Sequence, residues 1–316
     1  MSRASDARKS GRLTVKFWGC RGSFPVSGEA FLHFGGNTSC VEIRAGDHLV
    51  ICDMGTGIIR LGDLLLRNHL SSKGPGAQKP LETVILVSHA HHDHTQGFPF
   101  FKPAYIESSQ IHMFGPRMFN QDFSDILARS MMAPLFPVDL ADMHSTRRIQ
   151  NAEEADMIIL RKGAPPQVTS VQRNQHRPAA GSAVIRVLKN LAHPKGGVVN
   201  YRITYAGRSV VYATDVEGYV GGDSRLVKFA AGADLLIHDA QYVPEEYTGM
   251  PVPTQGYGHS TYEMAAAVAR QAGVRRLALF HHDPTHTDQE IREIEKQARR
   301  GFAETFAAYE GQELAL

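Results

Sequence analysis

Four histidines and an aspartate lie within six residues, and their spacing is typical of a metal-binding loop. The segment His89–His94 reads HAHHDH and follows residues 83–88, a β-branched run with the pattern of a buried strand. Imidazole nitrogens and carboxylate oxygens suit Zn²⁺, and also Mn²⁺ or Fe²⁺. The alternative is a solvated histidine-rich turn. The place of the segment at a strand end, and the acid within it, favour a metal site.

Further ligands are expected at other strand ends, because one loop cannot complete a site. His193 lies just past a predicted strand, and Asp215 follows the second strand of a predicted hairpin. His281 and His282 follow a third strand. Each residue alone is more readily a loop or core residue than a ligand. Together with the HxHxDH segment, they predict a site for two metal ions.

The elements that must position these residues fall into two strand-rich groups. Strands are predicted over 13–18, 39–44, 48–53, 83–88, 183–188, 201–206, 209–213, 234–238 and 276–280, and helices over 58–69, 118–132, 260–272 and 290–309. Residues 1–12 are predicted to be a flexible tail, and 71–80 and 163–181 to be loops. Strands with interleaved helices predict an α/β chain folded as a four-layer αββα sandwich. We expect a single domain over 13–316, with an inserted segment at about 102–182.

The full pattern resembles the metallo-β-lactamase fold superfamily of binuclear metallohydrolases. Three neighbouring motifs agree with it: FWGCRGS at 17–23, GGNTS at 35–39 and DMGTG at 53–57. The similarity runs over roughly 13–114 and 183–290. It implies two divalent ions, with Zn²⁺ expected first and Mn²⁺ or Fe²⁺ as alternatives. The implied ligands are His89, His91 and His193 for one ion and Asp93, His94 and His281 for the other, with Asp215 bridging the two.

Several residues next to this set have more than one interpretation. His281 is preferred to His282 as the last ligand, because it directly ends its strand. His92 is interpreted as a pocket wall, with a supporting role behind the ligands as the alternative. Asp53 and Asp239 are either acceptors for ligand imidazole N–H groups or partners within their own loops.

A further motif narrows the chemistry to phosphodiesters. The segment GYGHST at 256–261 resembles the GH(S/T)T element of ribonuclease Z and related cyclic phosphodiesterases, in which a histidine that binds no metal assists cleavage. A helix N-terminus favours negative charge, and the adjacent His259 could protonate a leaving alkoxide. The alternative is a capping-loop histidine. Glu217 is a candidate for orienting His259.

The predicted function is hydrolysis of a small or cyclic phosphodiester, with cyclic nucleotides among the candidates. Metal-bound hydroxide would attack phosphorus, and Asp93 and His259 are the predicted catalytic residues. A ribonuclease Z-like RNA-processing nuclease is the alternative, but residues 122–156 mix acids and bases rather than forming a basic arm. An ester or lactone hydrolase is a third possibility, against which His259 counts. A further alternative is a sensor or scaffold protein that binds metal and ligand but catalyses no reaction.

Composition excludes several other classes. Lys+Arg total 34 and Asp+Glu 32, so a net charge of +2 indicates neither a nucleic-acid nor a membrane partner. No apolar run reaches the ~18 residues of a membrane span. Cys20, Cys40 and Cys52 form no pairing pattern, which predicts a reducing, cytoplasmic location. None of them is placed to act as a thiolate ligand, which argues against an antibiotic hydrolase.

The last two predictions concern the oligomeric state and the apolar residues in the middle of the chain. The resemblance suggests a homodimer. A Met- and Phe-rich set is interpreted as core or a dimer contact rather than a lid: Met118, Phe119, Phe123, Met131, Met132, Leu135 and Phe136.

Overall fold

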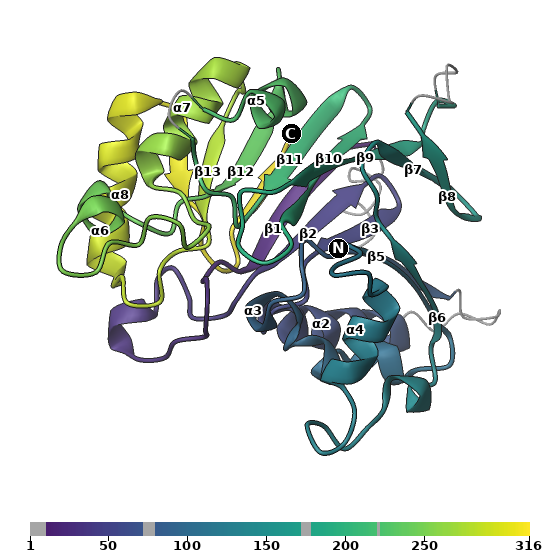
Figure 1. Ribbon diagram of the computed structural model, residues 1–316. Helices are drawn as coiled ribbons and strands as arrows, with labels where there is room; N and C mark the ends of the chain where they lie inside the picture. The colour runs from purple at the N-terminus through teal and green to yellow at the C-terminus, as the bar shows by residue number, and fades with distance from the viewer. Residues whose placement is uncertain (1–10, 72–79, 172–177, 220–221) are drawn as a thin grey trace.

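Two β-sheets pack face to face at the centre of the molecule, and helices cover their outer faces (Figure 1). The computed structural model describes residues 11–71, 80–171, 178–219 and 222–316. The predicted αββα sandwich is confirmed. The predicted tail at 1–12 and loop at 71–80 fall almost wholly outside the described residues. No helix in the described part of the chain has the length and apolarity that a membrane span requires.

The chain contributes its strands to the two sheets largely in sequence order. The first sheet has the order β15-β1-β2-β3-β4-β5-β6 and contains β1 (Leu13–Gly19), β2 (Cys40–Ala45), β3 (His48–Cys52), β4 (Leu81–Leu86), β5 (Ser109–Gly115), β6 (Thr146–Asn151) and β15 (Glu313–Ala315). The second has the order β14-β13-β12-β11-β10-β9-β7-β8 and contains β7 (Asp156–Arg161), β8 (Ala164–Ser170), β9 (Ala183–Asn190), β10 (Val198–Tyr205), β11 (Arg208–Ala213), β12 (Leu235–Asp239), β13 (Leu277–Phe280) and β14 (Thr305–Ala307).

Each sheet has its own helical cover. Helices α2 (Gly57–Ser71) and α4 (Phe123–Ser130) lie over the first sheet, and α5 (Ser224–Ala230), α7 (Tyr262–Ala272) and α8 (Asp288–Gly301) lie over the second (Figure 1). Two short helices, α3 (His92–Thr95) and α6 (Pro244–Thr248), lie in the connecting loops. The core between the sheets is apolar and includes Phe17, Tyr201 and Phe280.

Parallel pairing explains why the polar residues gather at one edge. Strands β3 to β6 are mutually parallel, as are β11 to β14. The carboxyl ends of parallel strands meet at a common edge, where ligand sites in α/β proteins form. Asp53 follows β3, the HxHxDH segment follows β4, and Asp215 and His281 follow β11 and β13. The fold therefore delivers these side chains to one place.

The segment at about 102–182 supplies β5 and β6 to the first sheet and β7 and β8 to the second. Two element predictions within it were wrong. The predicted loop at 163–181 contains β8, which is an edge strand. Its two prolines favour a loop in the sequence pattern, but proline is tolerated in edge strands. The helix predicted over 118–132 begins only at Phe123, because Phe119 and Asn120 have φ of 48° and 58°.

The last predicted helix was too long. It was expected over 290–309, but α8 ends at Gly301 and the chain becomes extended at Phe302 before it forms β14. The Met- and Phe-rich set divides between two environments. Phe123 and Met131 are buried against the first sheet, whereas Phe119 and Leu135 are exposed.

A buried arginine joins the loops that follow β1 and β13. The Arg21 side chain is fully buried and donates hydrogen bonds to the carbonyl oxygens of Gly35, Asp283 and His286. His286 in turn pairs with Glu246 of α6, with 2.8 Å between Nε2 and Oε1. These contacts fix the loop that begins at His281.

The His286–Glu246 pair predicts a pH-dependent contribution to stability. Burial would lower the pKa of His286, but Glu246 outweighs burial and raises it above its ordinary value. A raised folded-state pKa stabilises the protein fully below the unfolded-state pKa, and this contribution is lost as pH rises through the folded-state pKa. Glu246→Gln should therefore lower the Tm by about 2 °C more at about pH 6 than at about pH 9.

Differential scanning calorimetry at the two pH values measures this difference. Glu245→Gln is the matched control, because Glu245 lies on the same short helix and is exposed. An equal loss of Tm by Glu246→Gln at both pH values would show that the ion pair does not contribute.

Candidate metal centre

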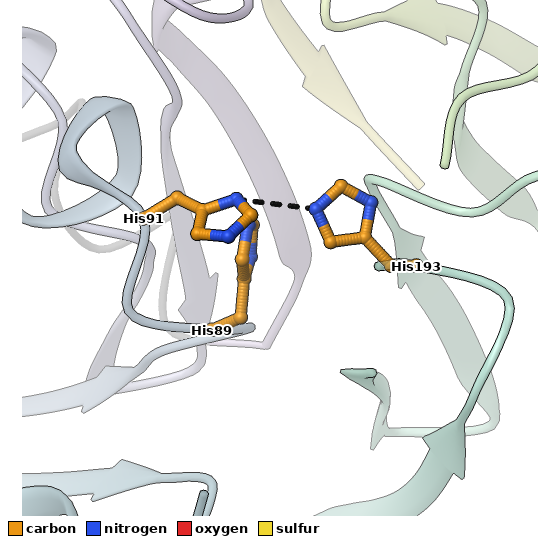
Figure 2. A group of neighbouring side chains, drawn as sticks. All are labelled: His89, His91 and His193. Carbon is orange, nitrogen blue, oxygen red and sulfur yellow. Dashed lines mark hydrogen bonds between the residues drawn. The ribbon is translucent and has the colours of Figure 1, made fainter. Parts of the chain in front are cut away.

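Three histidines from opposite halves of the chain converge in the first group of potential ligands. His89 and His91 come from the loop after β4, and His193 comes from the loop after β9, with its ring turned toward them (Figure 2). Their ligand atoms all lie within 4.8 Å of one another. Nδ1 of His91 is 3.2 Å from Nε2 of His193. This is the set that the resemblance implied for one ion.

The second group combines carboxylates with imidazoles. Asp93, His94, Asp215 and His281 are all buried, and their ligand atoms also lie within 4.8 Å of one another. Oδ2 of Asp93 is 3.1 Å from Nε2 of His94 and 3.0 Å from Nε2 of His281. The structure thus brings together every residue that the sequence predicted for the second ion.

Asp215 lies between the two groups, and each carboxylate oxygen faces one of them. Oδ2 is 3.6 Å from Nε2 of His89 and 3.9 Å from Nε2 of His193. Oδ1 is 3.2 Å from Nε2 of His94 and 3.3 Å from Nε2 of His281. This division is the arrangement that a bridging carboxylate requires.

The side chains fit divalent metal ions on two independent observations. Nε2 of His89 is buried and has no hydrogen-bond partner among the described residues, although buried polar atoms are nearly always satisfied. Burial also lowers the pKa of His89, His91 and His193, in the case of His91 to about 4. Three neutral imidazoles pointing at a common volume are the ligand form that zinc binds.

Asp53 supports the second group from behind. Its carboxylate accepts hydrogen bonds from the Ser88 backbone N–H at 2.7 Å, from the Ser88 hydroxyl at 2.8 Å and from the Tyr212 hydroxyl at 2.7 Å. Nδ1 of His94 lies 2.7 Å from the same carboxylate. Such a contact fixes the orientation of a ligand imidazole and leaves Nε2 free for a metal. Of the two roles that the sequence left open for Asp53, these contacts favour that of acceptor for a ligand imidazole.

Three of these residues have an unusual backbone conformation. Asp53, Asp215 and His281 have φ of 60°, 53° and 61°. The left-handed region is uncommon for residues other than glycine, and such residues cluster at functional sites. Asp53 and His281 directly follow β3 and β13, and Asp215 lies two residues after β11. The strain is tolerated because the buried partners around each side chain over-determine its position.

His259 lies at the edge of the second group and pairs with an aspartate. Nδ1 of His259 is 2.7 Å from Oδ2 of Asp239, and the His259 ring stacks on that of His281 at 5.0 Å between centroids. Burial would lower the pKa of His259, but the Asp239 carboxylate outweighs it and raises the pKa to about 9. The direction of this shift favours the protonated imidazole.

The group that orients His259 is Asp239 and not Glu217. The Glu217 carboxylate instead accepts hydrogen bonds from the Tyr247 hydroxyl and from the N–H groups of Gly256 and Gly258. The Gly258 carbonyl lies 2.9 Å from Nδ1 of His193. Glu217 thus holds the loop that precedes His259 and, through it, contacts the histidine of the first group.

His282 and His92 belong to neither group. Nε2 of His282 is turned away, 2.8 Å from the Ala308 carbonyl, so the geometry favours His281 as the ligand. His92 is exposed. Two contacts that support the ligands were not predicted from the sequence. Gln241 Oε1 lies 2.9 Å from Nδ1 of His281, and the Ser23 N–H donates to the Asp93 carboxylate. No sequence signal marks Gln241, because its role arises from the packing of β12 against β13.

Comparisons with known proteins agree with this geometry. The model of the beta-lactamase superfamily domain matches residues 48–282. A ribonuclease Z of Metallosphaera sedula is 27% identical over 241 residues, which cover 71% of this chain and 77% of that protein. The solved metallo-beta-lactamase fold protein YhfI of Bacillus subtilis is 19% identical, with a TM-score of 0.64 and coverage of 97% and 100%. A diphosphatase from the PhnP family is 15% identical, with a TM-score of 0.63 and coverage of 96% and 97%.

The chain therefore belongs to the beta-lactamase superfamily. Its two sheets and their helices form the metallo-β-lactamase sandwich that the motifs predicted. The class of protein defined by this fold and by the His/Asp groups is a metal-dependent hydrolase.

The contact between Asp53 and His94 predicts a specific loss of metal affinity. In Asp53→Asn a neutral amide replaces the carboxylate that accepts from Nδ1 of His94, so His94 becomes a weaker and less well oriented ligand. We therefore expect zinc to bind about 10- to 100-fold more weakly at the second of the two ligand groups. Competition with a chromophoric chelator, followed by metal analysis, measures the affinity and the number of ions bound.

Asp125→Asn is the control, because Asp125 is exposed on α4. Two zinc ions held by Asp53→Asn with wild-type affinity would contradict the supporting role of Asp53.

Proposed function

We propose that this protein is a binuclear metal-dependent phosphodiesterase that acts on a small or cyclic phosphodiester, with cyclic nucleotides as the first substrates to test. The observation that carries the proposal is the His259–Asp239 pair. It places a protonated imidazole 3.9 Å from the Asp215 carboxylate, at the edge of the second ligand group. A proton donor next to a metal centre suits a reaction that expels an alkoxide.

The residues that would hold two divalent ions are the two groups described above. His89, His91 and His193 would hold one ion, and Asp93, His94 and His281 the other, with Asp215 shared. When bound, such ions polarise the phosphoryl oxygens and make water nucleophilic at neutral pH. Zn²⁺ suits this donor set best, and Mn²⁺ or Fe²⁺ are alternatives.

The chain's own residues would orient the reaction. Asp239 holds Nδ1 of His259, so that Nε2 is the atom left to donate a proton to the leaving oxygen. The Ser23 N–H and His281 both contact Asp93 and would hold its carboxylate in place as a ligand. The buried surroundings strengthen each of these electrostatic contacts.

An RNA-processing nuclease is the second candidate, because curated relatives such as that of Metallosphaera sedula are named ribonuclease Z. The His259–Asp239 pair would serve that reaction equally well. The net charge of +2 favours a small substrate, since binding to RNA through phosphates depends on an excess of basic side chains. Activity on a structured RNA with a 3′ extension, and none on small diesters, would select the nuclease.

The role of His259 as a proton donor predicts dependence on the leaving group. His259→Ala should lower kcat by about 10²- to 10⁴-fold on a cyclic nucleotide, whose alkoxide needs protonation. The loss should be smaller on bis(p-nitrophenyl) phosphate, whose phenolate leaves readily without a proton. Asp239→Asn should show the same ordering with smaller losses. Steady-state kinetics on zinc-loaded protein, with metal content checked for each variant, measure both.

His144→Ala is the matched control, because His144 is exposed and belongs to neither ligand group. Equal losses on both substrates would show that His259 does not donate the proton. Turnover of carboxylic esters or lactones, with no phosphodiester cleaved, would overturn the proposed function itself.

A further inference from the structure

A large pocket lies beside the ligand groups, and the proposed reaction does not use it. Its volume is about 950 Å³, which falls within the range of small-molecule sites. The pocket lies between the loop after β9, the loop after β11, and the segment that joins α6 to α7. Its lining includes Leu191, His193, Glu217, Tyr219 and Met264.

The pocket borders the metal centre at His193. This residue lines the pocket, and its Nε2 faces His91 in the first ligand group. Glu217, also in the lining, is only two residues from Asp215. A molecule whose phosphate lies at the metal centre could therefore extend a covalently attached group into this space.

The pocket wall after β9 is fixed by close packing and hydrogen bonds. Gly196 and Gly197 have φ of 124° and 78°, and a Cβ on Gly197 would lie 2.4 Å from the Asn190 carbonyl oxygen. The Ala192 N–H donates to the Asn190 side chain, and the Glu217 N–H donates to the Ala192 carbonyl. A preformed wall of this kind requires little ordering when a ligand binds.

The lining favours an uncharged ring over a second phosphate. Lys195 and Glu217 are the charged side chains in it. The Lys195 side chain is exposed, and the Glu217 carboxylate already accepts three hydrogen bonds. The exposed apolar side chains Leu191 and Tyr219 are 71% and 53% exposed. Aromatic side chains stack on planar rings such as nucleobases.

We propose that this pocket binds the uncharged aromatic group of the substrate, of nucleobase size, which stays attached to phosphorus while the other ester bond breaks. This inference rests on the proposed phosphodiesterase function and adds the class of substrate: a small phosphodiester with one aryl or nucleoside arm. The arm lies against Leu191 and Tyr219, and the phosphate lies at the metal centre.

Two diesters with the same leaving group test the proposal. Bis(p-nitrophenyl) phosphate and methyl p-nitrophenyl phosphate both release p-nitrophenolate, but only the first keeps an aromatic arm. We expect a KM roughly tenfold lower for the aryl diester. Leu191→Ala and Tyr219→Ala should each raise that KM roughly three- to tenfold while they leave kinetics on the methyl diester unchanged. Leu70→Ala, which truncates an exposed leucine at the end of α2, is the matched control.

A binding measurement separates this proposal from the proposed function. Titration calorimetry compares p-nitrophenyl phosphate with methyl phosphate on zinc-loaded protein, and needs no turnover. Tighter binding of the aryl ester that is weakened by Leu191→Ala or Tyr219→Ala supports the pocket, even if neither diester is cleaved. The pocket proposal is overturned if both esters bind equally tightly, or if neither substitution weakens the binding of p-nitrophenyl phosphate. Neither result contradicts the proposed phosphodiesterase activity.

Discussion

The Asp215 carboxylate is the group on which the arrangement of the site depends. It is buried, and its two oxygens face different sets of imidazoles, at 3.2 to 3.9 Å. Burying a carboxylate is costly unless opposite charge surrounds it. The neighbouring His281 and His94 outweigh the effect of burial and hold the pKa of Asp215 well below its usual range. The carboxylate therefore stays ionised and available to both groups.

This arrangement makes the surrounding scaffold necessary. His94 can face Asp215 only because Asp53 holds its other nitrogen, and Asp53 is in turn held by Tyr212 of β11. His281 is held by Gln241 in the same way. These two imidazoles thus each have one nitrogen fixed by a partner and the other directed inward. A set of contacts like this orients ligands before any metal binds, which is the condition for tight and selective coordination.

The residues of the candidate metal centre could be predicted from the sequence more completely than the strands that surround them. The HxHxDH segment and the strand ends at His193, Asp215 and His281 carry their chemistry in residue type and local spacing, so they were predictable. Strand β6 alternates between exposed and half-buried residues and lacks an apolar face, and β8 begins APPQ at an edge, so local patterns could not reveal them. Asp239 was left with two roles, because its distance from His259 depends on how α7 packs against β12.

The two halves of the chain contribute jointly to each ligand group. His89 and His91 follow a strand of the first sheet, whereas His193 follows a strand of the second. Asp93 and His94 likewise meet Asp215 and His281 across the sandwich. Neither half can form a site alone, so metal ions that bind here bind the closed sandwich and not its separated sheets. Binding to the native state alone adds to its stability by mass action. Metal ions that would make water nucleophilic here would therefore also hold the two sheets together at this edge.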